Sequence, residues 1–258
     1  MNIFMGGLFE GIIWDSGALS NILMQDKNID LTVSGASSLI GFFYGMHGKN
    51  FYKYLKEFIE EKDNPIKPLI DSDLFSSRYK QAVTLLKLGT SGLELKNQTA
   101  FSKYLDSRFG TLSIEKLKHR VDFEVFDIKT GNFFLLDRKT RISQVLLSEL
   151  SILPYYKYCE VSDMFLIPSS YICLSPYNLS PDGLIISYEA GGSIPKAMNA
   201  AEILLKISYA RTRELFRIIS KDNDLITCEN ELKDPLDSIA FYDGMKTCQK
   251  YMEGKLEL

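Results

Sequence analysis

One serine in this sequence stands where an acyl-transfer nucleophile is expected. Ser37 lies in the small-residue turn Gly35–Ala36–Ser37–Ser38, which follows the β-branched segment 29–33 and precedes a helix-like apolar run. α/β hydrolases hold their nucleophilic serine on such a sharp strand-to-helix turn, where small neighbours permit the strained backbone. Leu39 stands where the pattern Gly-x-Ser-x-Gly has its second glycine. An ordinary N-cap or turn serine is therefore the alternative interpretation.

The two histidines are poorly placed to act as a base for Ser37. His47 lies ten residues further along the same expected helix, which is about 15 Å along its axis. His119 stands between two basic residues, and we expect both histidines to face solvent. The expected base is therefore a carboxylate. Glu189 is the best placed, because it follows the apolar strand predicted at 184–188, whereas Asp182 belongs to a Pro-Asp-Gly turn.

The N-terminal segment offers backbone donors that could face an anion. Residues 2–5 predict a short strand, which ends in Gly6–Gly7–Leu8–Phe9–Glu10–Gly11 before an apolar helix. A strand, a glycine turn and a helix can form a nest of N–H groups, although an ordinary βα turn is the favoured interpretation of this stretch alone. Two successive βα units thus place glycine turns at the carboxyl ends of their strands. Open α/β sheets bind ligands at that edge.

The remaining sequence predicts the elements that surround these two units. Helices are expected at 51–63, 77–88, 99–109, 143–150 and after Pro195, strands at 164–167 and 171–174, and a hairpin over 121–137. No linker divides the 258 residues, and 45% of them are hydrophobic. We therefore expect one domain over residues 1–258, in which residues 202–258 form a divergent helical C-terminal part.

Composition excludes several functional classes. The net charge of −3 argues against a nucleic-acid-binding surface. The four cysteines are widely spaced without a Cys-x-x-Cys pair, which indicates reduced structural thiols and argues against a zinc site. The N-terminus lacks a basic leader region, and no segment approaches the roughly 18 apolar residues that a spanning helix needs. The sequence therefore predicts a cytoplasmic protein. No pattern indicates its oligomeric state.

Taken in order, these motifs resemble those of the patatin-like acyl hydrolases, a family that uses a Ser–Asp dyad. The resembling segments are the oxyanion loop 6–11, the serine turn 35–38, the central hairpin 121–134, the Ser-rich segment 148–154 and the strand 184–192, which corresponds to the family's strand ending in Asp-Gly-Gly or Asp-Gly-Ala. The similarity runs from Met1 to about Ala201 and fades beyond it.

The resemblance implies a three-layer α/β/α fold with a mainly parallel central sheet. It also implies a lipid or acyl-ester substrate, no metal or organic cofactor, and a surface that allows peripheral contact with a membrane. The roles carried over are the nucleophile at Ser37, the base at Glu189, oxyanion donors at Gly6, Gly7 and Leu8, and nucleophile-turn positions at Gly35 and Ser38.

Four departures from the family pattern concern the chemistry. Leu8 replaces a glycine of the oxyanion loop, Glu10 a basic residue, and Leu39 the second elbow glycine. One register aligns Glu189 with the family's aspartate, while the other aligns Ala190 with it, and losing the base costs roughly 10²–10⁴ in rate. Two hypotheses follow: a serine acyl hydrolase, and a non-catalytic protein of the same fold that binds a lipid or a protein.

Overall fold

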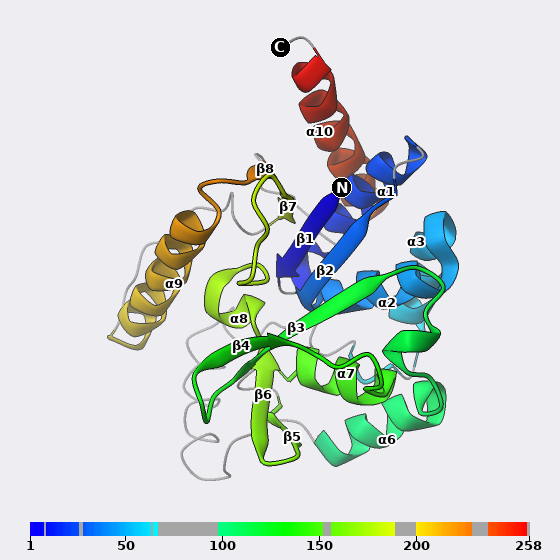
Figure 1. Ribbon diagram of the computed structural model, residues 1–258, viewed down its shortest axis with the longest axis vertical. Helices are drawn as coiled ribbons and strands as arrows, with labels where there is room; N and C mark the ends of the chain where they lie inside the picture. The colour runs from blue at the N-terminus through cyan, green and yellow to red at the C-terminus, as the bar shows by residue number, and fades with distance from the viewer. Residues whose placement is uncertain are drawn as a thin grey trace.

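The computed structural model describes residues 1–7, 9–25, 28–62, 64–66, 98–151, 156–188, 200–228 and 237–256. In these residues a central, mostly parallel sheet lies between two layers of helices (Figure 1). This three-layer α/β/α arrangement is the fold class that the sequence predicted.

The described elements are as follows. The strands are β1 (Asn2–Gly7), β2 (Asp30–Gly35), β3 (Val121–Asp127), β4 (Asn132–Leu135), β5 (Cys159–Val161), β6 (Met164–Pro168), β7 (Leu184–Ser187) and β8 (Asp224–Thr227). The α-helices are α1 (Ile12–Met24), α2 (Ser37–His47), α3 (Phe51–Glu60), α6 (Gln98–Phe109), α7 (Ile142–Glu149), α8 (Ser170–Cys173), α9 (Ala200–Ile219) and α10 (Ser238–Leu256). Short 3₁₀ helices are η1 (Phe9–Gly11), η2 (Gly48–Asn50) and η3 (Ile114–Lys116).

The described strands follow the order β5–β6–β3–β2–β1–β7–β8, and β4 pairs with β3. β8, β7, β1, β2 and β3 are parallel, whereas β4, β5 and β6 form an antiparallel extension on β3. Parallel neighbours need crossover connections, which is why α1 separates β1 from β2 in the sequence and α2 follows β2. The topology therefore places β1 and β2 at the centre of the sheet.

Alternation along the strands gives the sheet two apolar faces. The larger core lies between one face and helices that include α1, α2 and α7; its strand residues are Ile3, Met5, Leu31, Val33, Val121, Phe123, Leu184, Ile186 and Ile226. On the opposite face Phe4 and Ile185 pack with Leu174 and with Phe216 of α9. Figure 1 shows α8 and α9 on the side of β1 away from α2 and α3. The sheet is thus covered on both faces, as a parallel sheet requires.

Two predictions about individual elements were wrong. Residues 171–174 were expected to be a strand, but 170–173 form helix α8, in which Leu174 N donates to Ser170 O at 2.8 Å. A short apolar run does not distinguish the two by periodicity. The C-terminal part is not wholly helical, because β8 extends the sheet beside β7 between α9 and α10. The helix predicted at 77–88 lies outside the described residues.

The structure also bears on the predicted state of the four cysteines and on the presence of membrane-spanning helices. Cys159, Cys173, Cys228 and Cys248 are all buried, and none is in a disulfide, as the sequence predicted for structural thiols. Over the described ranges, no helix combines the length and apolar composition needed to cross a membrane.

The C-terminal helix is anchored to the core by close contact between α1 and α10. A Cβ at Gly17 of α1 would overlap the carbonyl oxygen of Phe241, and one at Gly244 of α10 would overlap that of Trp14. Trp14 Nε1 also donates to Asp243 Oδ2 at 2.9 Å. Small residues at both crossing points allow the two backbones to touch.

We expect Gly244→Ala to lower the free energy of unfolding by about 1–3 kcal/mol, because the added methyl group forces α10 away from α1. Gly254→Ala on the same helix is the matched control, since nothing lies within 4 Å of its Cβ position. That control should be neutral or stabilise by up to about 1 kcal/mol through helix propensity. Urea denaturation measures both; equal effects of the two substitutions would contradict the close packing.

Candidate functional site

Three neighbouring parallel strands end together at one edge of the sheet. Gly7 at the end of β1 pairs with Gly35 at the end of β2, and Met5 pairs with Ile186 of β7 on the other side. The glycine segment after β1, the serine turn after β2 and the residues after β7 therefore meet at the carboxyl edge. This is the edge at which open α/β sheets bind ligands.

The turn after β2 is shaped by a glycine with a left-handed backbone. Gly35 has φ +67°, and a Cβ there would overlap both Ser170 Oγ and Gly7 O. Ala36 N donates to Gly7 O at 2.9 Å, which joins the turn to the end of β1. A residue with a side chain would be strained and would clash at position 35.

Ser37 is the first residue of α2 and only 1% exposed. The strand, turn and helix predicted around it are present. The left-handed φ of this turn lies two residues earlier, at Gly35, and Ser37 is not among the positive-φ residues. The hydroxyl of Ser37 thus lies at the helix N-terminus, where a developing negative charge is favoured, but it is covered from solvent.

A buried carboxyl group holds the end of β2. Glu149, on α7, is 0% exposed, and its Oε2 accepts hydrogen bonds from Gly35 N at 2.8 Å and Ser34 Oγ at 3.1 Å. Burial raises the pKa of Glu149 well above its ordinary value against the effect of these two bonds, and the nearby Glu124 raises it further. Burial therefore favours the neutral form of this carboxyl group in the folded protein.

Ser34 connects this carboxyl group to α8. Ser34 Oγ accepts a hydrogen bond from Ser170 N at 3.1 Å, so α8 is attached to the same point. Within the described structure, the side-chain oxygens of Ser38, Ser169, Ser170 and Ser187 and Oε1 of Glu149 are buried without a hydrogen-bond partner. Buried polar atoms without partners are costly, and such groups gather at functional sites more often than elsewhere.

The end of β7 is tied to the first turn of α1. Tyr188 N donates to Asp15 Oδ1 at 3.0 Å, and a Cβ at Gly11 would lie 2.6 Å from Tyr188 Cβ. Glu189 follows Tyr188 directly but lies outside the described residues, as do Ala190 and Leu8. Tyr188, the residue directly before Glu189, therefore lies at the same edge of the sheet as Gly7 and Gly35.

The remaining predicted positions lie as follows. Gly6 pairs with Ser34, and its Cβ position is 2.5 Å from Ser175 Cα, so no side chain fits there. Leu39 is wholly buried in the larger core, which shows that it is a packing residue of α2. His119 is exposed as expected, but His47 is only partly exposed and stacks on Tyr54 at 3.6 Å between ring centroids. Among the described residues, no group of three or more acidic, histidine or cysteine side chains could hold a metal ion.

Glu149 is the residue of this edge that the sequence analysis missed. A signal was present, because Glu149 lies three and four residues after Leu146 and Val145 on the buried face of the predicted helix. A carboxylate on an apolar helix face needs a polar partner in the fold. The partner, the end of β2, is 114 residues distant in the chain, so the sequence could not identify it.

Comparisons with known proteins add little to this picture. No model of a known protein family matches the sequence. No curated protein matches it either. Among solved structures, the crystal structure of VipD from Legionella pneumophila is similar to 98% of this chain, with a TM-score of 0.46 and 9% identity. The similarity spans 66% of that chain, and at this TM-score it supports no argument about function.

Replacing Glu149 by glutamine should change how stability depends on pH. Because the pKa of Glu149 is raised in the folded protein, protonation of its carboxyl group contributes to the free energy of unfolding. This contribution is fully present below the ordinary pKa of about 4.5 and is lost as pH rises to the folded-state pKa. Above pH 4.5 the wild type should therefore lose stability relative to Glu149→Gln, with a limiting slope of about 1.4 kcal/mol per pH unit. Urea denaturation across this pH range measures the difference, and Glu160→Gln on β5 is the exposed control. A pH-independent difference would contradict a raised pKa of Glu149.

Proposed function

We propose that this protein is a patatin-like serine hydrolase that cleaves acyl esters of lipids at the carboxyl edge of β1, β2 and β7. One observation carries the proposal: the glycine segment, the serine turn and the strand leading to Glu189 adjoin one another, with Gly7 paired to Gly35 and Met5 to Ile186. Acyl transfer needs a nucleophile, a base and oxyanion donors within a few ångströms.

In the proposed reaction, Ser37 Oγ bonds to the carbonyl carbon of the ester as its proton passes to the Glu189 carboxylate. The carbonyl oxygen becomes an oxyanion, which backbone N–H groups of Gly7 and Leu8 stabilise. Collapse of the tetrahedral intermediate releases the alcohol, which takes the proton from Glu189. A water molecule, deprotonated by Glu189, then attacks the acyl-serine; the bond between Ser37 Oγ and the carbonyl carbon breaks, Oγ takes the proton back from Glu189, and the fatty acid is released. No metal or organic cofactor takes part. A cytoplasmic location stays a prediction from the sequence.

A fluorophosphonate probe should label the wild type at Ser37 and should not label Ser37→Ala. Ser107→Ala, which removes an exposed serine on α6, is the control and should be labelled normally. Glu189→Gln should lower ester hydrolysis by roughly 10²–10⁴-fold, because the base is lost while the shape is kept. Labelling of both the wild type and Ser37→Ala, or of neither, would contradict the proposal.

A second candidate function is supported by the burial of Ser37. Its exposure of 1% and the position of the left-handed φ at Gly35 differ from a hydrolase elbow, in which the serine hydroxyl is exposed at the turn. Under this alternative, the protein retains the fold without the reaction and binds a lipid or a protein. Glu10 in place of the family's basic residue favours it as well, and so does Ala190 in the register that aligns it with the family's aspartate.

The alternative predicts that Glu10→Arg combined with Ala190→Asp creates fluorophosphonate labelling that the unmodified protein lacks. Glu10→Gln combined with Ala190→Asn is the matched control without the basic and acidic groups and should stay unlabelled. Leu39 is left unchanged, because truncating a fully buried leucine costs about 2–5 kcal/mol of stability. Ester hydrolysis by the unmodified protein that Ser37→Ala abolishes would eliminate this alternative.

A further inference from the structure

The reaction proposed for Ser37 depends on where the turn before α2 places its hydroxyl. Attack on an ester carbonyl needs the nucleophile and the oxyanion donors in a fixed arrangement, and a displacement of about 1 Å can cost roughly 10²-fold in rate. Ser37 is the first residue of α2 and follows Gly35 by two positions. The contacts that hold the Gly35 peptide therefore bear directly on the position of Ser37 Oγ.

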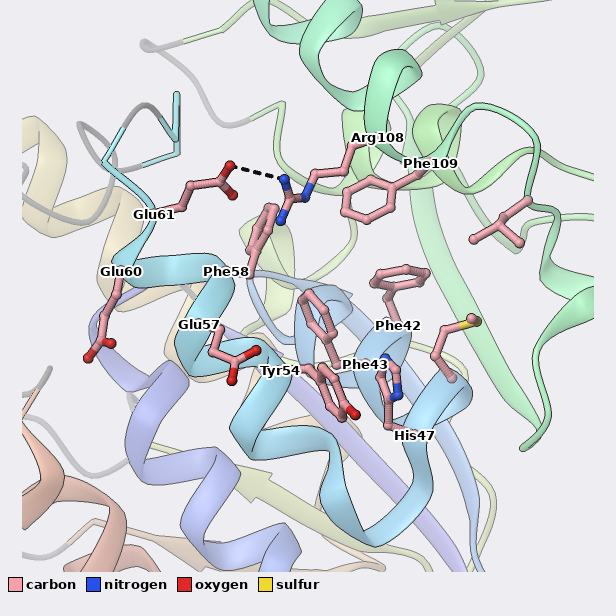
Figure 2. Close-up of a pocket in the computed structure, with 12 residues that line it drawn as sticks. Phe42, Phe43, His47, Tyr54, Glu57, Phe58, Glu60, Glu61, Arg108 and Phe109 are labelled. Atoms are coloured by element: carbon pink, nitrogen blue, oxygen red, sulfur yellow. Dashed lines mark hydrogen bonds and ion pairs between the residues drawn. The ribbon is translucent and has the colours of Figure 1, made fainter.

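The C-terminal half of α2 is held by packed aromatic rings (Figure 2). Phe42 packs edge-on against Phe109 of α6, with 4.8 Å between ring centroids, and Phe43 lies 5.5 Å from Phe58 of α3. All four rings are buried. These contacts begin five residues after Ser37, so they seat the body of α2 separately from the turn at its N-terminus.

The turn at the N-terminus is held by a single carboxyl group. Glu149 Oε2 accepts hydrogen bonds from Gly35 N at 2.8 Å and from Ser34 Oγ at 3.1 Å. Gly35 is buried and has a left-handed φ of +67°. Without this acceptor its N–H would carry the desolvation cost of an unpaired buried donor, which favours a shift of the turn.

The same turn contacts the strand that carries a proposed oxyanion donor. Ala36 N donates to Gly7 O at 2.9 Å, and a Cβ at Gly35 would lie 2.5 Å from Gly7 O. The peptide that Glu149 holds is therefore in direct contact with Gly7. A shift of this turn would change the distance between Ser37 Oγ and the Gly7 N–H, the two groups that must act on one ester carbonyl.

We propose that Glu149 is a positioning residue of the acyl-transfer site, which fixes the Gly35 peptide and thereby the place of Ser37 Oγ relative to Gly7. This role rests on the proposed function. Glu149 acts through Gly35 and does not contact the ester, and the proton of Ser37 still passes to Glu189. A glutamine at position 149 keeps a carbonyl acceptor at the same reach, whereas a leucine has no acceptor.

The kinetics of fluorophosphonate labelling at Ser37 test this role in the full chain. Glu149→Leu should lower the maximal labelling rate by about tenfold or more and leave the half-saturating probe concentration within about twofold, because the nucleophile is displaced while the binding surface is kept. Glu149→Gln should stay within about threefold of the wild type. Circular dichroism and urea denaturation give the folded fraction to which each rate refers. Glu149→Met, which conserves the volume better, replaces Glu149→Leu if the latter does not fold, with the same expected loss.

Glu124→Leu is the matched control, because it removes another buried carboxyl group. Glu124 is also 0% exposed, but it accepts from the backbone N–H groups of Tyr177 and Asn178, in the loop after α8. This control should lose stability and keep the maximal labelling rate within about twofold.

Three results would overturn the positioning role alone. They are unchanged labelling of the apolar variant at position 149, an equal loss in Glu124→Leu, and a loss in Glu149→Gln as large as in the apolar variant. Absence of labelling in the wild type would overturn the proposed function and this role with it, so the two failures are distinguished by the wild type.

Discussion

The hydrogen bonds between Glu149 and the end of β2 support the rest of the described structure. Placing a carboxyl group in an apolar interior is unfavourable unless it is neutral or well bonded. Burial raises the pKa of Glu149, which favours its neutral form, and its Oε2 accepts hydrogen bonds from Gly35 N and Ser34 Oγ. Ser34 in turn holds Ser170 N. One side chain thus joins α7, the turn that starts α2, and α8 at the carboxyl edge of the sheet.

The parallel order of the central strands determines what can meet at that edge. β1, β2 and β7 run in the same direction, so their carboxyl ends and the turns that follow lie together, although β7 begins 149 residues after β2 ends. The close contact between Gly7 and Gly35 needs glycine at the second position, because a Cβ there would overlap the first. Glycine at this edge therefore serves the packing of two strands, whether or not an ester is hydrolysed there.

Helix α2 connects two different chemical environments. Its N-terminus carries the buried Ser37, directly after the turn whose Gly35 N donates to Glu149, while its C-terminal half carries Phe42, Phe43 and His47 among aromatic and acidic side chains of α3 and α6. The first environment places a hydroxyl at a helix N-terminus, and the second is a cluster of packed aromatic rings.

Residue types and spacing were sufficient to predict a mixed α/β fold, the first two βα units, the hairpin of β3 and β4, and the turn that carries Ser37. Those features depend on local periodicity and on turn-forming residues, which a sequence records directly. The strand order, the helix at Ser170–Cys173, the edge strand β8 and the contact of Glu149 with Gly35 were decided only by tertiary packing. Each of them joins segments that are far apart in the chain, or depends on a run too short for its period to distinguish helix from strand.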